Sequence, residues 1–452
     1  MQSIDTILRR IQTKRTDLAL FWKTQEYSYS DFIVMVDAWS ELLPAYQIGK
    51  GTVCGFIADY SPQVCALVFA LMKSKAILVP FTTAIKHELP EFIEIAGVTC
   101  LFRFDQDDHW TFETCESSEQ NHLVESFLER DVPGLIVFTS GSTGKPKGIL
   151  QDCERVMRKF VEERPGWRTV LFLMLDHFGG FNTLLSTFAY GGTAVCLTDR
   201  SSESVCRIIQ QSKATLLPTT PTFINLLIAS RCYKDFDLSS VKLITYGTEV
   251  MPSSTLEKVR GIFPNATIKQ TYGLSELGVL RSKSEHDDSV WVKIGGDGFE
   301  TKIIDNILWV RSEANMVGYL NAPNPFNEEG WMCTGDHVEV RGEYMHIQGR
   351  QSEMINVGGQ KVFPAEIENV LLEADNIQEV TVVGIKHPVM GNVVKAIITL
   401  NEPEEQFQLV ERLRGHCLAR MARYKVPVKY EIVNAGEQHS LRFKKIRKEI
   451  LP

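Results

Sequence analysis

Residues 135–148 read Leu135-Ile-Val-Phe-Thr-Ser-Gly-Ser-Thr-Gly-Lys-Pro-Lys-Gly148, an apolar strand that leads into a loop rich in glycine, hydroxyl groups and lysine. Glycines let the backbone approach an anion, hydroxyls donate hydrogen bonds and lysines supply positive charge. A plain turn needs only glycine and serine, so this richer combination indicates a phosphate-binding loop. The candidate residues are Thr139, Ser140, Gly141, Ser142, Thr143, Gly144, Lys145 and Lys147.

The loop departs from a Walker P-loop at two positions. That motif needs a glycine at the fifth position before its Gly-Lys pair and a serine or threonine directly after the lysine. This chain has Thr139 and Pro146 there. Pro146 also lacks a backbone N–H and disfavours the start of a helix. A P-loop kinase or ATPase, which would release ADP, is therefore disfavoured.

Composition limits the class of protein. The chain has 452 residues, enough for two or three domains. Its net charge of −8 argues against a general nucleic-acid binder, because phosphate contacts favour a basic surface. Ten cysteines are scattered without a C-x-x-C pair, which indicates small buried side chains in a reducing compartment and no zinc site. We expect a cytoplasmic protein.

No segment has the pattern of a signal peptide or a membrane span. Apolar residues at positions 4, 7, 8 and 11 have the spacing of an amphipathic helix. The longest apolar run, Val64–Met72, is far shorter than the roughly 20 residues that a membrane span needs.

The order of the patterns predicts an α/β fold. Apolar strands alternate with helical segments between residues 27 and 81 and again between 169 and 249, which indicates parallel sheets covered by helices. We expect a buried strand at 169–175 and a helix that runs through Tyr190. Residues 294–347 instead show short alternating runs separated by glycine and asparagine, typical of a small antiparallel barrel or sheet. Two strands and a helix from Phe407 predict a compact α+β unit at the end.

Three junctions between a strand and a loop carry candidate binding residues. They are Asp176-His-Phe-Gly-Gly180, Gly247-Thr-Glu249 and Thr271-Tyr-Gly-Leu-Ser-Glu276. Ligands of open α/β sheets bind beyond the carboxyl ends of the strands. A lone histidine or a turn glutamate is more often structural. Only their shared position at the ends of strands supports a role of these residues in ligand binding.

Four further motifs occupy the last third of the chain. They are Glu329-Gly-Trp-Met-Cys-Thr-Gly-Asp336, Gly349-Arg-Gln-Ser352, Met354-Ile-Asn-Val-Gly-Gly-Gln-Lys-Val-Phe-Pro-Ala-Glu-Ile-Glu368 and Ser440-Leu-Arg-Phe-Lys-Lys-Ile-Arg-Lys448. The last of these could be no more than a basic tail, which is the usual meaning of a terminal charge run.

In this order, the motifs resemble those of the adenylate-forming superfamily, in its acyl-CoA synthetase branch of aryl- and fatty-acid ligases. The resemblance extends from about residue 27 to 448. It implies a large N-terminal AMP-binding domain over 1–349, with a β-rich subdomain at about 290–349, and a small mobile C-terminal domain over 350–452.

The resemblance implies a role for each motif in nucleotide binding. The loop at 140–148 would hold the β- and γ-phosphates of ATP, Glu276 would orient Mg²⁺, and Ser275 would reach the α-phosphate. Asp336 and Arg350 would fix the ribose, since a carboxylate only accepts hydrogen bonds. The remaining nucleotide contacts would come from Gly247, Thr248, Glu249, Thr271, Tyr272 and Gly273.

The resemblance also implies sites for the acid and the thiol. His177, Phe178, Phe181, Gly247 and Gly278 would line the acid pocket. Gly358, Gly359 and Lys361 would approach the thiol, and Ser352 would act as the hinge, although the family usually has Asp or Lys there. Lys445 aligns with the catalytic lysine, with Lys444 in place of the usual glycine.

The expected reaction joins a fatty or aromatic acid to AMP, releases pyrophosphate and passes the acyl group to CoA. Peptide synthetases hold an α-amine with an aspartate, but Asp176 lies one position away from that alignment. Transfer to the phosphopantetheine of a carrier protein is the alternative for the thiol. A catalytically silent nucleotide-binding module is the alternative of another class, because of Lys444 and Ser352.

Overall fold

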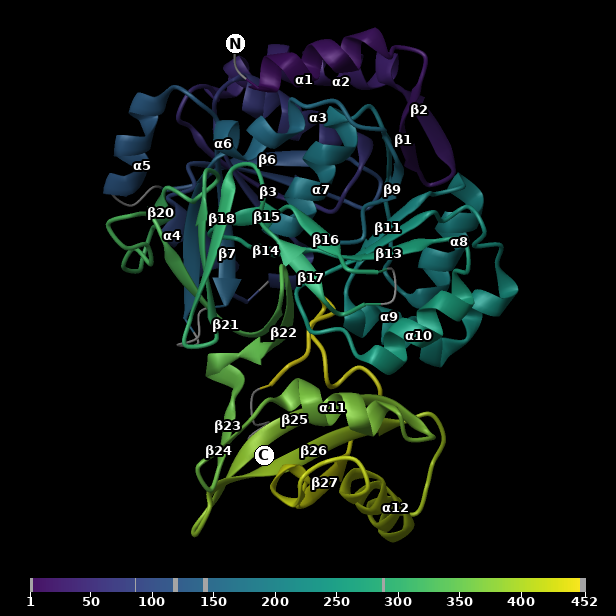
Figure 1. Cartoon of the computed structure of the whole chain (residues 1–452). Helices are drawn as coiled ribbons and strands as arrows, with labels where there is room; N and C mark the ends of the chain where they lie inside the picture. Colours follow the sequence, from purple (N-terminus) through teal and green to yellow (C-terminus); the bar gives the residue numbers. More distant parts are fainter. Residues whose placement is uncertain (1–2, 86, 117–120, 141–144, 287–288, 448–452) are drawn as a thin grey trace.

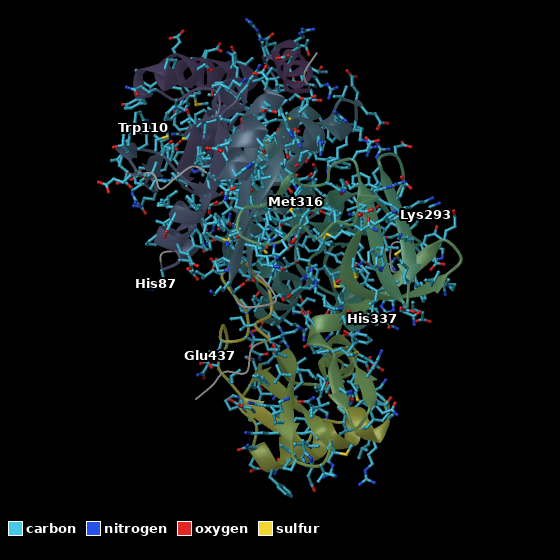
Figure 2. The ribbon with its side chains drawn as sticks, turned by 90° about the vertical axis from the view of Figure 1, so that its left-hand side faces the viewer. His87, Trp110, Lys293, Met316, His337 and Glu437 are labelled. Atoms are coloured by element: carbon cyan, nitrogen blue, oxygen red, sulfur yellow. The ribbon has the colours of Figure 1, made fainter. Side chains whose placement is uncertain are left out.

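The computed structural model describes residues 3–85, 87–116, 121–140, 145–286 and 289–447. Figure 1 shows a large domain, a small domain below it, and a yellow C-terminal tail that returns from the small domain to the large one. In Figure 2, turned by 90°, His337 and Glu437 mark two sides of the junction between the domains.

Two seven-stranded sheets form the large domain. The first has the order β13 (Thr267–Gln270), β12 (Leu243–Tyr246), β11 (Leu216–Thr219), β9 (Arg168–Val170), β10 (Thr193–Val195), β1 (Leu18–Trp22) and β2 (Gln25–Ser28). The second has the order β20 (Gly318–Tyr319), β8 (Pro146–Asp152), β7 (Gly134–Ser140), β4 (Ile77–Phe81), β3 (Val53–Ile57), β5 (Cys100–Phe104) and β6 (Trp110–Thr114). The central strands of both sheets are parallel, which confirms the expected α/β class.

Helices cover and separate these sheets. They are α1 (Ser3–Thr13), α2 (Tyr29–Leu42), α3 (Pro62–Lys73), α4 (Leu89–Ala96), α5 (His122–Phe127), α6 (Cys153–Met157), α7 (Phe178–Ala189), α8 (Ser202–Ser212), α9 (Pro221–Ser230) and α10 (Ser253–Ile262). Short 3₁₀ turns are η1 (Leu43–Tyr46), η2 (Thr83–Ile85), η3 (Leu128–Arg130), η4 (Arg158–Phe160) and η5 (Cys232–Asp235).

The longest apolar run of the sequence is the core helix. Every residue from Val64 to Met72 in α3 is fully buried, because residues of both sheets surround the helix on all sides. The N-terminal amphipathic helix is also confirmed, since Ile4, Ile7 and Ile11 of α1 are buried. Across the described ranges, no helix combines the length and the apolar character that crossing a bilayer requires.

The β-rich region is a six-stranded antiparallel sheet. Its order is β16 (Ser282–Ser284), β17 (Val292–Ile294), β22 (Tyr344–Arg350), β21 (Met332–Arg341), β19 (Ile307–Ser312) and β18 (Phe299–Ile304). A separate hairpin, β14 (Tyr272–Leu274) and β15 (Gly278–Leu280), carries the motif at 271–276.

The small domain begins after η6 (Gln351–Glu353). Its sheet has the order β24 (Gln360–Val362), β23 (Ile355–Val357), β26 (Gly391–Leu400) and β25 (Ile377–His387), with β27 (Lys429–Ile432) parallel to β26. It also contains α11 (Pro364–Leu372), α12 (Gln406–Leu418) and η7 (Arg423–Lys425), and it has its own core. The predicted helix from Phe407 is confirmed as α12.

The strand expected at 169–175 is wrong beyond Val170, where β9 ends. Residues 171–175 are largely buried but irregular, because side chains bind the carbonyl groups that a neighbouring strand would otherwise bind. Arg200 Nε donates to the carbonyl of Phe172 at 2.7 Å, and the Tyr60 hydroxyl donates to that of Leu173 at 2.8 Å. The chain thus bends across the start of α7.

The close contact between residues 171–175 and α7 requires a glycine in the first turn of that helix. A Cβ atom on Gly180 would overlap the carbonyl oxygen of Met174 and come within 2.7 Å of the Tyr60 hydroxyl. We predict that Gly180→Ala lowers the free energy of unfolding by about 1–3 kcal/mol, the usual cost of overpacking. Urea denaturation measures the change.

The matched control is Gly261→Ala in α10. This glycine is exposed, and a Cβ atom there would have no neighbour within 4 Å. Alanine should stabilise this helix by about 0.5–1 kcal/mol. Equal effects of the two substitutions would contradict the close approach at Gly180.

Candidate active site

A cavity of about 240 Å³ lies where β11, β12, β14 and the start of α7 meet the C-terminal tail. The parallel strands β11 and β12 end at this cavity, as expected for a ligand site of an open α/β sheet. Phe172, Phe178 and Leu216 give it apolar walls, whereas His177, Thr271 and Ser275 contribute polar groups. It is therefore suited to an apolar molecule with a polar end.

The structure divides the predicted acid-binding residues into two groups. His177, Phe178 and Gly247 line the cavity, whereas Phe181 is fully buried in the core behind it. Gly278 is also outside the lining; its φ of +82° reverses the chain next to Phe178 and Ala314.

One end of the cavity continues toward Asp336. Gly247, Thr248, Tyr272 and Gly273 line this end. The Tyr272 hydroxyl donates to Asp336 Oδ2 at 2.6 Å, and Arg350 Nε lies 3.3 Å from Asp336 Oδ1. Burial raises the pKa of the Asp336 carboxyl, while the Arg350 charge opposes that rise. The carboxylate is thus held in a fixed position by a donor on each oxygen.

Close packing explains the residues that flank this end. A side chain on Gly247 would come within 2.7 Å of the Thr271 hydroxyl and 2.9 Å of its carbonyl oxygen. Thr248 next to it has a φ of +72°, a strained value for a β-branched residue. Such strain is concentrated at ligand sites.

Glu276 lies beside the second half of the glycine-rich loop. Its Oε1 accepts a hydrogen bond of 2.7 Å from the Tyr319 hydroxyl. The ammonium of Lys147 lies 5.0 Å from the centre of the Tyr319 ring, so these three side chains form one cluster. Thr139 and Lys147 face each other in the β7–β8 hairpin, and Lys145 is exposed near its tip. Gly141, Ser142, Thr143 and Gly144 lie outside the described residues.

The tail is bound to the large domain through its main chain. The Thr220 hydroxyl donates to the carbonyl of Phe443 at 2.9 Å, and the N–H of Lys445 donates to Glu249 Oε1 at 2.7 Å. Glu249 is fixed in turn by the Thr222 hydroxyl at 2.6 Å. The predicted nucleotide residue Glu249 therefore holds the tail.

Lys444 is the lysine that enters the cavity. Its Nζ lies 2.9 Å from His177 Nε2. Burial and the neighbouring Arg442 charge lower the pKa of Lys444 to about 8. The Lys444 ammonium, together with burial, keeps the pKa of His177 well below its usual range. His177 is thus neutral near pH 7 and accepts a hydrogen bond from Lys444.

The structure does not bring Lys445 into the cavity. Its Nζ donates to Glu368 Oε2 at 2.6 Å, and Arg447 pairs with the same buried carboxylate. Burial alone would raise the pKa of Glu368, but the charges of Arg447 and Lys445 lower it to about 2. Lys445 therefore joins the tail to α11.

Asp176 also binds the tail. Its Oδ2 accepts hydrogen bonds from Arg442 at 2.7 Å and from the Thr82 hydroxyl at 2.9 Å, and the side chain is only 3% exposed. Asp176 does not line the cavity, and its Oδ2 is used by the tail and by Thr82.

The predicted thiol residues lie away from the cavity. Gly358 and Gly359 form the turn between β23 and β24, with φ values of +57° and +88°, and Lys361 is exposed in β24. Ser352 is exposed in η6, between the two domains. The structure thus gathers part of the predicted nucleotide and acid residues at one cavity, but not these; the gathered residues are His177, Phe178, Gly247, Thr248, Thr271, Tyr272, Gly273 and Ser275.

Lys444 is the residue that alignment missed, and no local pattern in the sequence identifies it. The tail turns back on itself at this point: the Phe443 N–H donates to the carbonyl of Ser440 at 2.9 Å, Phe443 has a φ of +52°, and His439 pairs with Lys445. The direction of the Lys444 side chain therefore depends on how this turn docks onto the large domain.

Two family models match this chain. A family model described as AMP-binding enzyme matches residues 8–320, and one described as AMP-binding enzyme C-terminal domain matches residues 366–439. The chain belongs to the AMP-binding enzyme family. The resemblance to adenylate-forming enzymes, drawn from the motifs, is therefore confirmed.

Relatives of this AMP-binding enzyme match nearly its whole length. The 2-succinylbenzoate–CoA ligase of Bacillus subtilis is 24% identical, over 95% of this chain and 93% of its own. The indoleacetate–CoA ligase of Aromatoleum aromaticum is 28% identical, over 95% and 94%. The long-chain-fatty-acid–CoA ligase FadD13 of Mycobacterium tuberculosis is 24% identical, over 95% and 94%.

Solved structures show the same fold. The anthranilate CoA ligase AuaEII in complex with anthranoyl-AMP superposes with a TM-score of 0.80 at 20% identity, covering 96% of this chain and 93% of that one. The o-succinylbenzoate CoA synthetase of Bacillus subtilis, in complex with its acyl-adenylate, gives 0.76 at 20% identity, covering 99% and 97%.

The buried carboxylate of Glu368 generates a prediction about the tail. Glu368→Gln leaves Lys445 without its counter-charge and Arg447 with Glu353 alone, which lies 3.1 Å from its Nε, so we expect a loss of about 3–5 kcal/mol in unfolding free energy, measured with urea at pH 7. The carboxylate contributes its stability above pH 4.5 and loses it as the pH falls toward 2. The difference between the two proteins should therefore shrink on acidification.

Glu366→Gln on the same helix is the matched control. Glu366 pairs with Lys425 but is 47% exposed, so its loss should cost less than about 1 kcal/mol. A Glu368 variant as stable as this control would show that the tail does not depend on that carboxylate.

Proposed function

We propose that the protein is an ATP-dependent acid–CoA ligase that makes an acyl-adenylate and then an acyl thioester. The observation that carries the proposal is that Lys444 and His177, 2.9 Å apart, line a cavity with apolar walls that is also lined by Tyr272, whose hydroxyl binds Asp336. An acid lying along the apolar walls would place its carboxylate where the α-phosphate of ATP would also lie. The names of the relatives described above support CoA as the thiol.

In the first step, a carboxylate oxygen of the acid attacks the α-phosphorus of ATP. The new P–O bond replaces the bond to the leaving pyrophosphate, so negative charge grows on the α-phosphate oxygens. Lys444 and Ser275, which line the cavity, would stabilise this charge, and neutral His177, 2.9 Å from the Lys444 ammonium, would position it. Catalysis of this kind depends on positioning and electrostatics.

Nucleotide binding uses the residues around Asp336. The Asp336 carboxylate, held by Tyr272 and Arg350, would accept hydrogen bonds from the ribose hydroxyls. Lys147 and the rest of the glycine-rich loop would bind the β- and γ-phosphates.

The site fits Mg²⁺ that arrives with ATP. Within the described ranges, no cluster of three or more His, Cys, Asp or Glu side chains could bind a metal by itself. Mg²⁺ needs only one or two carboxylates when phosphates and waters complete its shell. Glu276, which binds Tyr319 through one oxygen, can serve as that carboxylate. When bound, the ion would offset charge on the phosphates.

In the second step, the sulfur of CoA attacks the acyl carbon, AMP leaves with the electron pair of the broken C–O bond, and the thiol proton passes to solvent. Gly358, Gly359 and Lys361 would approach the thiol after the small domain turns about Ser352. A carrier protein would present the same pantetheine arm and remains the alternative acceptor.

The walls of the cavity favour a fatty or aromatic acid. Phe172, Phe178 and Phe443 surround the space beyond His177. Asp176 does not line the cavity, and the described lining residues include no Asp or Glu side chain that could bind the amine of an amino acid.

The first prediction tests the reaction class. The protein should exchange labelled pyrophosphate into ATP only when a suitable carboxylic acid and Mg²⁺ are present, and should form AMP on adding CoA. A panel of fatty and aromatic acids identifies the best substrate. Release of ADP, or ATP binding without exchange for any acid, would refute the proposal. A phosphopantetheinylated carrier protein replaces CoA in a parallel reaction.

A second prediction separates the adjacent lysines. Lys444→Met should slow acid-dependent exchange about a hundred- to thousandfold, as expected when a charge-stabilising donor is lost. Lys445→Met is the matched control and should retain the rate within severalfold, because its ammonium binds Glu368. The reverse pattern would assign the reaction to Lys445 instead.

The pH dependence provides a third test of Lys444. Its ammonium is present below its pKa of about 8 and is lost above it. For the wild-type enzyme, kcat/KM for ATP, which reports the free enzyme, should fall as the pH rises through this value. Lys444→Arg should move the decline to higher pH. An unchanged profile would contradict the assignment.

A further inference from the structure

We propose that the far end of the acyl pocket binds a second carboxylate on the substrate, through Lys159 and Asn182. The preferred acid would then be a dicarboxylic one whose apolar middle lies along the walls of the cavity. This inference rests on the proposed function and narrows its substrate class.

One face of α7 forms a wall of the pocket. His177 precedes this helix, and Gly179, Asn182, Thr183 and Ser186 line the cavity from one face of it. Asn182 lies five residues beyond His177, which corresponds to roughly 7 Å along the helix axis. A substrate with its reacting carboxylate near His177 and Lys444 would thus extend toward Asn182.

Lys159, in η4, lies directly behind this part of the wall. Its Nζ donates to Asn182 Oδ1 at 2.7 Å and to the carbonyl of Val279 at 3.0 Å. Asn182 and Val279 both line the cavity. Two of the three ammonium protons of Lys159 are therefore used by residues of the cavity wall, and one is left for another acceptor.

The charge of Lys159 lacks a counter-charge. No carboxylate in the described part of the chain forms an ion pair with it. The neighbouring Arg281 has its own carboxylates: its guanidinium binds Glu162 at 2.9 Å and Asp297 at 3.1 Å. Burial, with a smaller contribution from the Arg281 charge, lowers the pKa of Lys159 to about 7.

With a pKa of about 7, the Lys159 side chain is partly neutral near pH 7, and a carboxylate beside it would favour the charged form. A purely structural link from η4 to α7 would need only a neutral donor such as glutamine. A ligand carboxylate would supply the missing charge.

Asn182 provides the second observation. Because its Oδ1 accepts from Lys159, its amide nitrogen is left with two N–H donors, and the structure gives them no acceptor among the described residues. Asn182 can thus donate to a carboxylate in the cavity while Lys159 supplies the charge behind it.

The test compares pairs of acids that differ only at the far end. Straight-chain and aromatic monocarboxylic acids are assayed by pyrophosphate exchange beside counterparts that carry a second carboxylate there, with the spacing varied. Wild-type enzyme should have the higher kcat/KM for a dicarboxylic acid of matching length. Lys159→Gln should lower that value about ten- to a hundredfold, mainly through KM, because a charged hydrogen bond is lost.

The same substitution should leave the monocarboxylic acids within about twofold of wild type, whereas Lys159→Arg should keep most of the preference. Asn182→Leu is a second variant that removes the amide donors and should also reduce the preference. Melting temperatures close to wild type confirm that each variant is folded.

The outcomes separate the two proposals. Exchange with monocarboxylic acids but no preference for any dicarboxylic acid would overturn this inference alone. An equal loss for both kinds of acid in Lys159→Gln would also overturn it, because that is the result of a structural role. Absence of exchange with every acid in wild-type enzyme would refute the proposed function itself.

Discussion

The docking of a short C-terminal tail onto the large domain governs the chemistry of the cavity. Thr220 binds the carbonyl of Phe443 and Glu249 binds the N–H of Lys445, and the side chain of Lys444 between them lines the cavity. Two buried carboxylates then take the other cations of the tail. Asp176 binds Arg442, whereas Glu368 binds Lys445 and Arg447. Lys444 alone of these four faces a neutral histidine, which leaves its charge available to an anionic ligand.

Much of this architecture could be predicted from local sequence. Periodicity identified α1, the start of α12 and the alternation of strands and helices, because these features depend on nearby residues. Motif order indicated the family and assigned both Tyr272 and Asp336 to the nucleotide site, and the structure joins the two by a hydrogen bond of 2.6 Å. The fully buried α3 was visible as the longest apolar run.

The remaining features depend on contacts between distant residues. The choice between Lys444 and Lys445 is made by Glu249 and Glu368, which lie 196 and 77 positions away from Lys445. The end of β9 at Val170 depends on Arg200 and Tyr60, and no local pattern records either contact. No motif in the sequence marks Lys159, because a single lysine in a segment of mixed composition is common. Its contacts with the cavity wall distinguish it from the other lysines, and they appear only in the folded chain.

Phe443 has a consequence for how such an enzyme could diversify. Its ring lies against Phe172 and Phe223 of the large domain, with centroids 5.2 and 5.6 Å apart, and it closes one wall of the acid cavity. The shape of the acid cavity therefore depends partly on a residue of the C-terminal tail, which follows the sheet of the small domain. A substitution in that tail can change which acids fit the cavity while α7 stays the same. Two enzymes with the same large domain can therefore differ in the acid that they prefer.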